Sequence, residues 1–263
     1  MCIRDSYITY LPDATEKDIL ETVEFVSNQN LVPITHLPAR TMKDLEHVSS
    51  FLKELRKRTD SKKILVIGGG GNQNGSISSS LEILESDLLH DNDFTEIGVA
   101  GHPEGSPDIN QETINDFLNK KYDLSQNKNL NIELVTQFFF NASPFIDWCQ
   151  DLKAKNINLP VRVGFPGPAS FKTLLNFGIM SGVGNSINFL KKNSSKVTDL
   201  LTKTSNDGML IELANFAQGE NSLKSFHCFP FGGFEKTCLW LNAVQSGEFT
   251  IDNSKIVLHK KIF

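Results

Sequence analysis

The stretch KKILVIGGGGNQNGSISSSLEILES, residues 62–86, joins a short apolar strand to a helical pattern through a loop that begins with four glycines. Glycine loses more backbone entropy on folding than any other residue, so this run indicates that something passes close to the main chain. The third glycine of a dinucleotide fingerprint is missing at residues 73–74, and the lysine of a P-loop is missing between Gly75 and Ser76. The stretch therefore predicts a ligand loop of neither common class.

The same alternation of strand and helix continues on both sides of this loop. Near-continuously apolar strands are typical of a sheet covered on both faces, and their alternation with helices predicts an α/β fold with a parallel sheet. Helical patterns cover residues 15–29 and 76–90, with Asp13 and Ser76 as expected N-caps. The tail, residues 247–263, reads as a short strand or an extended cap. The predicted strands are residues 7–12, 31–40, 63–71, 96–105, 132–140, 159–167 and 225–233.

Two arrangements of such a sheet fit this pattern, an open doubly wound sheet and a (β/α)8 barrel. The barrel is favoured because unusual residues fall at the carboxyl ends of the strands, which in a barrel form one ring where catalytic residues gather. These residues are Thr9, His36, Gly68–Gly71, His102–Glu104, Gln137, Gly164 and Phe231–Gly233.

Composition narrows the class of protein. The 263 residues have a net charge of −5, which gives no support to nucleic-acid binding. No apolar run is long enough to span a membrane, and no signal-peptide pattern opens the chain. The cysteines form no CxxC pair, which argues against zinc or dithiol chemistry, and four free thiols suit a reducing cytoplasm. They are Cys2, Cys149, Cys228 and Cys238.

Several strand ends resemble one family. VAGHPE at 99–104, TQFFFN at 136–141 and FHCFP at 226–230 are similar to VAxYPExHPE, TQFFFD and FHFYT of methylenetetrahydrofolate reductase, the flavin enzyme of one-carbon metabolism. YITYLP at 7–12 and ITHLPAR at 34–40 look like its VTYG and PHLT segments. The order and spacing of these segments agree along most of the chain.

The resemblance implies a (β/α)8 TIM barrel that passes a hydride from NAD(P)H through FAD to 5,10-methylenetetrahydrofolate. Lys120 and Lys121 match the basic pair that holds the FAD pyrophosphate. Gln137 matches the glutamine that hydrogen-bonds the pterin, and Phe177 matches the phenylalanine that packs on folate or nicotinamide. No metal is implied, and His36 and His102 are the candidates for a catalytic role. The residues implied to bind FAD are Thr9, His36, Gly68, Gly69, Gly70, His102, Lys120 and Lys121.

The chain departs from the family in three places. Gly70 stands where the family has an aspartate near the flavin, with Asn72 the nearest polar side chain. His102 and Ser106 replace a tyrosine and a histidine. The family's first strand, which carries the glutamate thought to act as general acid, is not matched. We therefore expect a single barrel domain over residues 7–263 that lacks its first strand–helix unit, with residues 1–6 a non-native or disordered leader.

Three functions compete. The first is a methylenetetrahydrofolate reductase-like oxidoreductase. The second is a folate- and flavin-binding barrel without reductase activity that partners a folate-dependent methyltransferase, which Gly70 favours. The third, a lyase or aldolase barrel, would need a Schiff-base lysine at a strand end, and the seven predicted ends have none. A homo-oligomer is left open. Each proposed ligand contact has a structural alternative: Gln137 bonding neighbouring backbone, the histidines as satisfied core residues, and Lys120–Lys121 as surface lysines.

Overall fold

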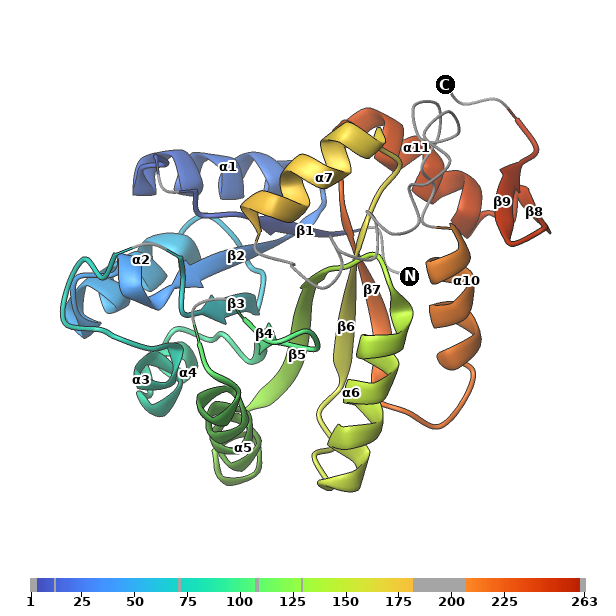
Figure 1. Ribbon diagram of the computed structural model, residues 1–263. Helices are drawn as coiled ribbons and strands as arrows, with labels where there is room; N and C mark the ends of the chain where they lie inside the picture. The colour runs from blue at the N-terminus through green and yellow to red at the C-terminus, as the bar shows by residue number, and fades with distance from the viewer. Residues whose placement is uncertain are drawn as a thin grey trace. The chain divides into compact units, whose positions relative to one another are not determined.

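The computed structural model describes residues 4–11, 13–70, 72–106, 109–128, 130–181 and 207–260 (Figure 1). Helices and strands alternate along the chain. They are β1 (Asp5–Ile8), α1 (Glu16–Asn28), β2 (Val32–Pro38), the 3-10 helix η1 (Ala39–Thr41), α2 (Leu45–Arg56), β3 (Lys63–Ile67), α3 (Ser80–Glu85), α4 (Leu88–Asp91), β4 (Glu96–Gly101), α5 (Gln111–Asn127), β5 (Asn131–Phe138), α6 (Ala142–Ala154), β6 (Val161–Pro166), α7 (Phe171–Met180), α10 (Asp207–Phe216), β7 (Leu223–Phe229), α11 (Phe234–Gln245), β8 (Phe249–Asp252) and β9 (Lys255–Leu258).

Seven strands form one sheet in the order in which they occur along the chain, from β1 to β7. The pairs β1–β2, β2–β3, β3–β4 and β6–β7 are parallel. A doubly wound sheet reverses its strand order at a switch point, whereas this order is that of the wall of a barrel. The predicted parallel α/β sheet is therefore confirmed, and the doubly wound alternative is wrong. β1 and β7 are the terminal strands of this order, and the (β/α)8 barrel lacking its first strand–helix unit stays a prediction.

The chain divides into two compact units, which are described separately below. The N-terminal unit contains the described residues up to Ala100 together with Asn115–Leu134, and the C-terminal unit contains Gly101–Ile114 and the described residues from Val135 onward. The elements β4, α5 and β5 contribute residues to both. The prediction of one domain over residues 7–263 stays a prediction.

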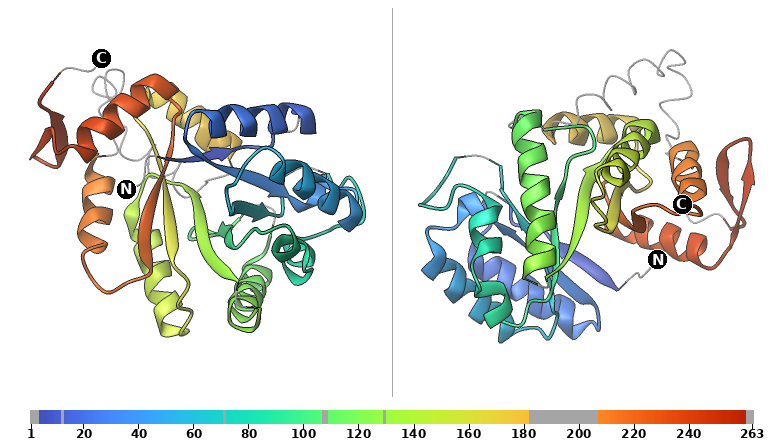
Figure 2. Two further views of the ribbon diagram at one scale, coloured as in Figure 1. Left: turned by 180° about the vertical axis from the view of Figure 1, so that it is seen from behind. Right: turned by 90° about the horizontal axis from the view of Figure 1, so that it is seen from below.

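In the N-terminal unit, α1 and α2 pack beside β1–β3, as Figures 1 and 2 show. Three successive residues of β3, Ile64, Leu65 and Val66, are all buried, although successive side chains of a strand point to opposite faces. The sheet is thus covered on both sides here, and the apolar pattern of the strand follows from that. From α2, the fully buried side chains are Val48, Phe51, Leu52 and Leu55.

In the C-terminal unit, β5 and β6 approach each other closely at Gly164. A Cβ atom at this position would lie 2.7 Å from the carbonyl oxygen of Thr136, so any side chain would collide with the neighbouring backbone. The Gly164 N–H instead donates to Thr136 Oγ1 at 2.8 Å, which satisfies a buried hydroxyl. Gly164 is therefore explained by strand packing, and α6 and α10 lie side by side on the outside of this unit (Figure 1).

Both predicted N-caps are wrong. Thr15, rather than Asp13, caps α1, because Thr15 and Asp18 form a reciprocal capping box. Ser79, rather than Ser76, caps α3, and the predicted helix 76–90 is divided into α3 and α4. Ser76 is used elsewhere, since its backbone N–H donates to the Lys43 carbonyl.

Two further boundaries differ from the sequence pattern. β1 begins at Asp5, two residues before the predicted strand, so residues 5 and 6 pair with Val32 and Pro33. The leader expected over residues 1–6 stays a prediction. The tail forms the antiparallel hairpin β8–β9 rather than a single short strand or cap. Its two turn residues, Asn253 and Ser254, have φ values of 47° and 60°, which is the backbone geometry that a tight two-residue hairpin turn requires.

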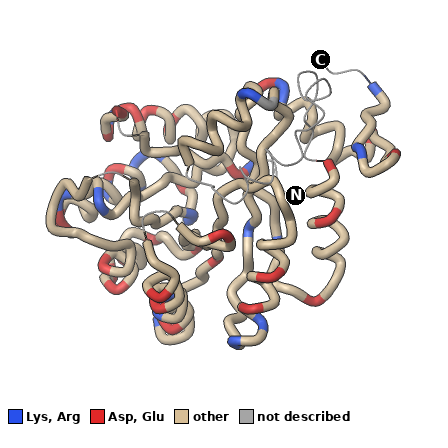
Figure 3. Tube along the Cα trace, in the orientation of Figure 1, with Lys and Arg blue, Asp and Glu red and all other residues tan. Residues whose placement is uncertain are grey.

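Charges of both signs are interspersed over the helices of each unit (Figure 3). This distribution agrees with the modest net charge of the sequence. Within the part of the chain that the structure describes, no helix combines the length and apolar character needed to cross a bilayer.

The Thr15 capping box should contribute measurably to the stability of the fold. Thr15→Ala removes the oxygen that accepts from the Asp18 N–H, so we expect the free energy of unfolding in urea to fall by about 1 kcal/mol. Asp13→Ala is the matched control and should have little effect. A larger decrease in the free energy of unfolding for Asp13→Ala than for Thr15→Ala would show that Asp13 is the N-cap, as the sequence predicted.

Candidate functional site

Within the N-terminal unit, several predicted residues lie at one edge of the sheet. Ile8 is in register with Thr35, and Pro38 is in register with Ile67. Thr9 therefore follows directly after β1, His36 lies near the end of β2, and Gly68 follows directly after β3. Because the three strands are parallel, these residues share the carboxyl edge of the sheet, as the sequence predicted.

The glycines of the loop after β3 have two different explanations. Gly69 has φ +84°, and an added Cβ would lie 2.9 Å from Pro38 Cβ; at Gly75 it would lie 1.9 Å from the Lys43 carbonyl oxygen. Gly69 is thus required by packing against the last residue of β2, and Gly75 by packing against the segment that follows β2. At Gly68 and Gly70 an added Cβ would meet no atom within 4 Å. These two leave bare backbone facing open space, which is the property that a ligand loop needs. Gly71 lies outside the described residues.

His36 carries a buried nitrogen without a hydrogen-bond partner. Its Nε2 atom is buried and unbonded, and the Tyr7 ring lies edge-on to the imidazole with 6.0 Å between ring centroids. Burial lowers the pKa of His36 to about 4, so the imidazole is neutral at pH 7. An unsatisfied buried polar atom is destabilising unless a ligand or water bonds to it. A neutral His36 fits a ligand contact better than an acid that must hold a proton at neutral pH.

The two predicted phosphate-binding lysines have different surroundings. Lys120 is exposed on α5, and its ammonium group pairs with Asp116 at 2.8 Å. Lys121 is buried, and its ammonium group donates to the Ala100 carbonyl near the end of β4 at 3.0 Å. Burial lowers the pKa of Lys121 to about 8. Each ammonium group has three N–H donors, so neither contact by itself excludes a phosphate, and the shared role implied by the resemblance stays a prediction.

In the C-terminal unit, Phe177 belongs to an aromatic cluster. Its ring stacks on Phe231 with 4.2 Å between centroids and an interplanar angle of 15°, and Phe138 meets Phe231 edge-on at 4.7 Å. The cluster also contains Phe140 and Phe229. The family resemblance singled out Phe177, but nothing in the sequence singled out Phe231 as its partner.

Gln137 and His102 also lie in the C-terminal unit. Gln137 is exposed on β5, and its side-chain oxygen accepts from the Phe138 N–H at 3.2 Å, so it makes the backbone contact named as the structural alternative. His102 is half-buried directly after β4, and its carbonyl accepts from Gly105, which has φ +79°. Their predicted contacts with folate and FAD stay predictions.

Thiol and metal chemistry have little support in the described residues. Burial raises the pKa of Cys149 and Cys228 to about 12, so both are protonated thiols at neutral pH. In the same part of the chain, no group of three or more His, Cys, Asp or Glu side chains is arranged to hold a metal ion.

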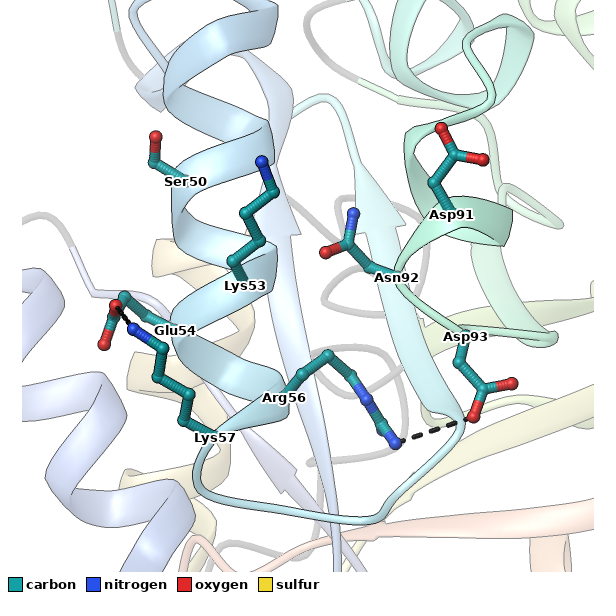
Figure 4. Close-up of a pocket in the computed structure, with 8 residues that line it drawn as sticks. All are labelled: Ser50, Lys53, Glu54, Arg56, Lys57, Asp91, Asn92 and Asp93. Carbon is teal, nitrogen blue, oxygen red and sulfur yellow. Dashed lines mark hydrogen bonds and ion pairs between the residues drawn. The ribbon is translucent and has the colours of Figure 1, made fainter.

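A groove lined by charged and polar residues on the outside of the N-terminal unit contains none of the predicted site residues (Figure 4). It lies between α2 and the end of α4. Figure 4 shows Arg56 reaching toward Asp93, and the two groups are 3.6 Å apart, while Lys57 pairs with Glu54 at 2.6 Å. Because most of its charges pair with one another, the groove offers little unpaired charge to a ligand. Its lining residues are Ser50, Lys53, Glu54, Arg56, Lys57, Asp91, Asn92 and Asp93.

The strand order and the residues at the carboxyl edge of the sheet define an α/β protein with a barrel-type strand order and a candidate ligand site at the carboxyl ends of its strands. A stretch of 79 residues is 39% identical to methylenetetrahydrofolate reductase 1 of Schizosaccharomyces pombe, and 75 residues are 29% identical to methylenetetrahydrofolate reductase 2 of Saccharomyces cerevisiae. These matches cover 30% and 27% of this chain and 12% of each relative. No family model matches the chain.

The buried state of His36 should make the protein sensitive to acid. The folded-state pKa of about 4 lies below the ordinary value of 6.5, so the unfolded chain binds a proton that the folded chain does not. The free energy of unfolding should therefore be highest above pH 6.5 and should decrease by about 3 kcal/mol as the pH falls to 4. His36→Gln should remove this dependence on pH of the free energy of unfolding, measured by urea denaturation. His90→Gln, at an exposed histidine, should leave it unchanged, and an NMR pKa of His36 near 6.5 would contradict the assignment.

Lys121 should produce the corresponding effect in alkali. Its folded-state pKa of about 8 lies below the ordinary 10.5, so the unfolded chain again binds more protons between these values. The free energy of unfolding should therefore rise with pH over this window, by about 3 kcal/mol in full. We expect Lys121→Met to abolish the rise and Lys120→Met, at an exposed position, to retain it. Equal slopes in the two variants would mean that the Lys121 ammonium is solvated.

Proposed function

We propose that this chain is a methylenetetrahydrofolate reductase-like flavoprotein that transfers hydride from NAD(P)H through FAD to 5,10-methylenetetrahydrofolate. One observation carries the proposal: the unpartnered buried Nε2 of His36 lies at the same strand edge as the bare backbone of the loop after β3. The similarity to the two yeast reductases supports folate and its redox cofactor as the ligands to test at this edge.

The residues of the N-terminal unit fit a flavin in three respects. Gly68 and Gly70 leave room for a planar ligand against the main chain. His36, neutral at pH 7, offers one hydrogen bond to a ligand atom without introducing charge. Thr9 adds an exposed hydroxyl at the end of β1. FAD, when bound, would supply the ring that accepts and donates hydride.

The chain's own residues would bind and orient the reactants. In the C-terminal unit, the proposed role of Phe177 is to pack on the folate or nicotinamide ring with the face that does not stack on Phe231. Gln137 would exchange its bond with the Phe138 N–H for one to the pterin. The proposed role of Lys120 and Lys121 is to bind the pyrophosphate through N–H donors beyond those that contact Asp116 and the Ala100 carbonyl.

A second candidate is a flavin- and folate-binding barrel without reductase activity. Opening the folate ring to an iminium requires a positioned proton donor, which typically contributes a hundredfold to ten-thousandfold in rate. Gly70 provides no carboxylate, and His36, with a pKa of about 4, is a neutral imidazole at pH 7 rather than the imidazolium that could act as a general acid. These two observations favour binding without efficient turnover. Localisation in the cytoplasm and assembly as a homo-oligomer belong to this proposal as expectations.

Flavin binding to the loop tests the proposal directly. Gly68→Ala combined with Gly70→Ala places methyl groups in space that the protein leaves open, so the fold should be undisturbed while the dissociation constant for FAD rises about tenfold or more. The measurement is the change in flavin absorbance on titration of the purified chain. Gly208→Ala, where an added Cβ also meets no atom within 4 Å, is the matched control and should bind FAD normally.

No flavin binding by the wild-type chain would remove both candidates. If FAD binds, folate-dependent oxidation of NAD(P)H separates them. Turnover assigns the chain to the reductases. Binding of FAD and folate without turnover assigns it to the second candidate.

A further inference from the structure

His47 uses both nitrogens of its ring, and each bond joins it to a different element. Its Nδ1 atom accepts from the Lys43 N–H at 3.1 Å, so the ring proton is on Nε2. That nitrogen donates to Glu16 Oε1 in the first turn of α1. The ring therefore connects the start of α1 to the segment between β2 and α2.

The carbonyl group of Lys43, in the next peptide unit, holds the glycine loop. It accepts from the Ser76 N–H at 2.7 Å and from the Ser76 hydroxyl at 3.3 Å. Gly75 packs so closely against the Lys43 Cα and carbonyl that no side chain could be accommodated there. Lys43 thus lies directly between His47 and the end of the loop.

The loop is bonded along the rest of this segment as well. The Arg40 N–H donates to the Gly68 carbonyl at 3.0 Å, and the Asn74 N–H donates to the Arg40 carbonyl at 2.8 Å. The Asn74 side chain donates to the Thr41 carbonyl at 3.2 Å. Residues 40–43 therefore form a support to which both ends of the loop are attached, and the position of this support sets where the Gly68 and Gly70 backbone lies.

We propose that His47 is a positioning residue for the glycine loop. Its bond to the Lys43 N–H fixes the support, and the support holds the bare backbone at the end of β3 in the conformation that receives a ligand. The identity of that ligand as a flavin rests on the proposed function, whereas the positioning itself does not.

The imidazole is not needed to start α2. The backbone N–H of His47 donates to Asp44 Oδ1 at 2.8 Å, and Asp44 is the N-cap of the helix. That cap survives any change to the ring. A variant of the ring therefore tests the loop rather than the helix.

Two substitutions of His47 separate the bond to Lys43 from the bulk of the ring. His47→Phe keeps a ring of similar size but provides no acceptor for the Lys43 N–H. His47→Asn places its amide oxygen near the position of Nδ1, so it can restore that one bond while losing the bond to Glu16. Hydrogen–deuterium exchange of the full chain, without ligand, measures protection of the Asn74 and Ser76 amides. The Leu65 and Val66 amides of β3 report global opening.

We expect the Asn74 and Ser76 amides of His47→Phe to exchange about tenfold faster, the scale of one lost hydrogen bond, with β3 unchanged. His47→Asn should restore protection. Unchanged loop exchange in His47→Phe would overturn the proposal. So would equal acceleration in β3, which would mean that the ring supports the whole unit. Equal acceleration in both variants would also overturn it, because the bond to Lys43 would not be the link.

Titration with FAD then adds the functional readout. His47→Phe should weaken FAD about tenfold, and His47→Asn should bind close to wild type. His90→Phe, at an exposed histidine on α4, is the matched control. If the wild-type chain binds no FAD while the exchange pattern is as expected, the proposed function fails and the positioning role of His47 stands.

Discussion

The close approach of two backbone segments at Lys43 and Gly75 constrains the whole carboxyl edge of the N-terminal unit. The two segments are so near that a methyl group at Gly75 would overlap the Lys43 carbonyl oxygen. Hydrogen bonds to Lys43 and Arg40 hold the loop on either side of this contact. The loop after β3 is therefore a fixed part of the fold, and its two unobstructed glycines are presented in a set position.

Burial disfavours positive charge at two places in the N-terminal unit, at His36 in β2 and at Lys121 on α5. His36 and Lys121 are both buried, and burial lowers the pKa of each toward the neutral form. Their nitrogens differ in one respect, because Lys121 bonds to the Ala100 carbonyl while His36 Nε2 has no partner. The Lys121 ammonium group thus satisfies the Ala100 carbonyl at the end of β4. The His36 Nε2 atom has no such partner, and a ligand can provide one. This difference makes His36 the stronger of the two as a ligand contact.

Local pattern predicted the elements better than their ends. The apolar runs identified all seven strands of the sheet, since burial on both faces leaves a clear composition. The first residues of helices were harder to predict, because Asp13 and Thr15 are both acceptable N-caps and only the reciprocal bond with Asp18 decides between them. The hairpin at the tail was missed because its turn uses Ser254 at positive φ, where glycine is the usual signal.

By itself, the sequence determined the α/β class, the alternation of strand and helix, and which residues follow each strand, because all three depend on local composition and period. The strand order came only from the tertiary structure, since pairing joins segments far apart in the chain. So did the sorting of the glycines into packed and open positions. Gly68, Gly69, Gly70 and Gly75 are identical as letters, and only the distance from each to Pro38 or Lys43 decides which of them a ligand could use.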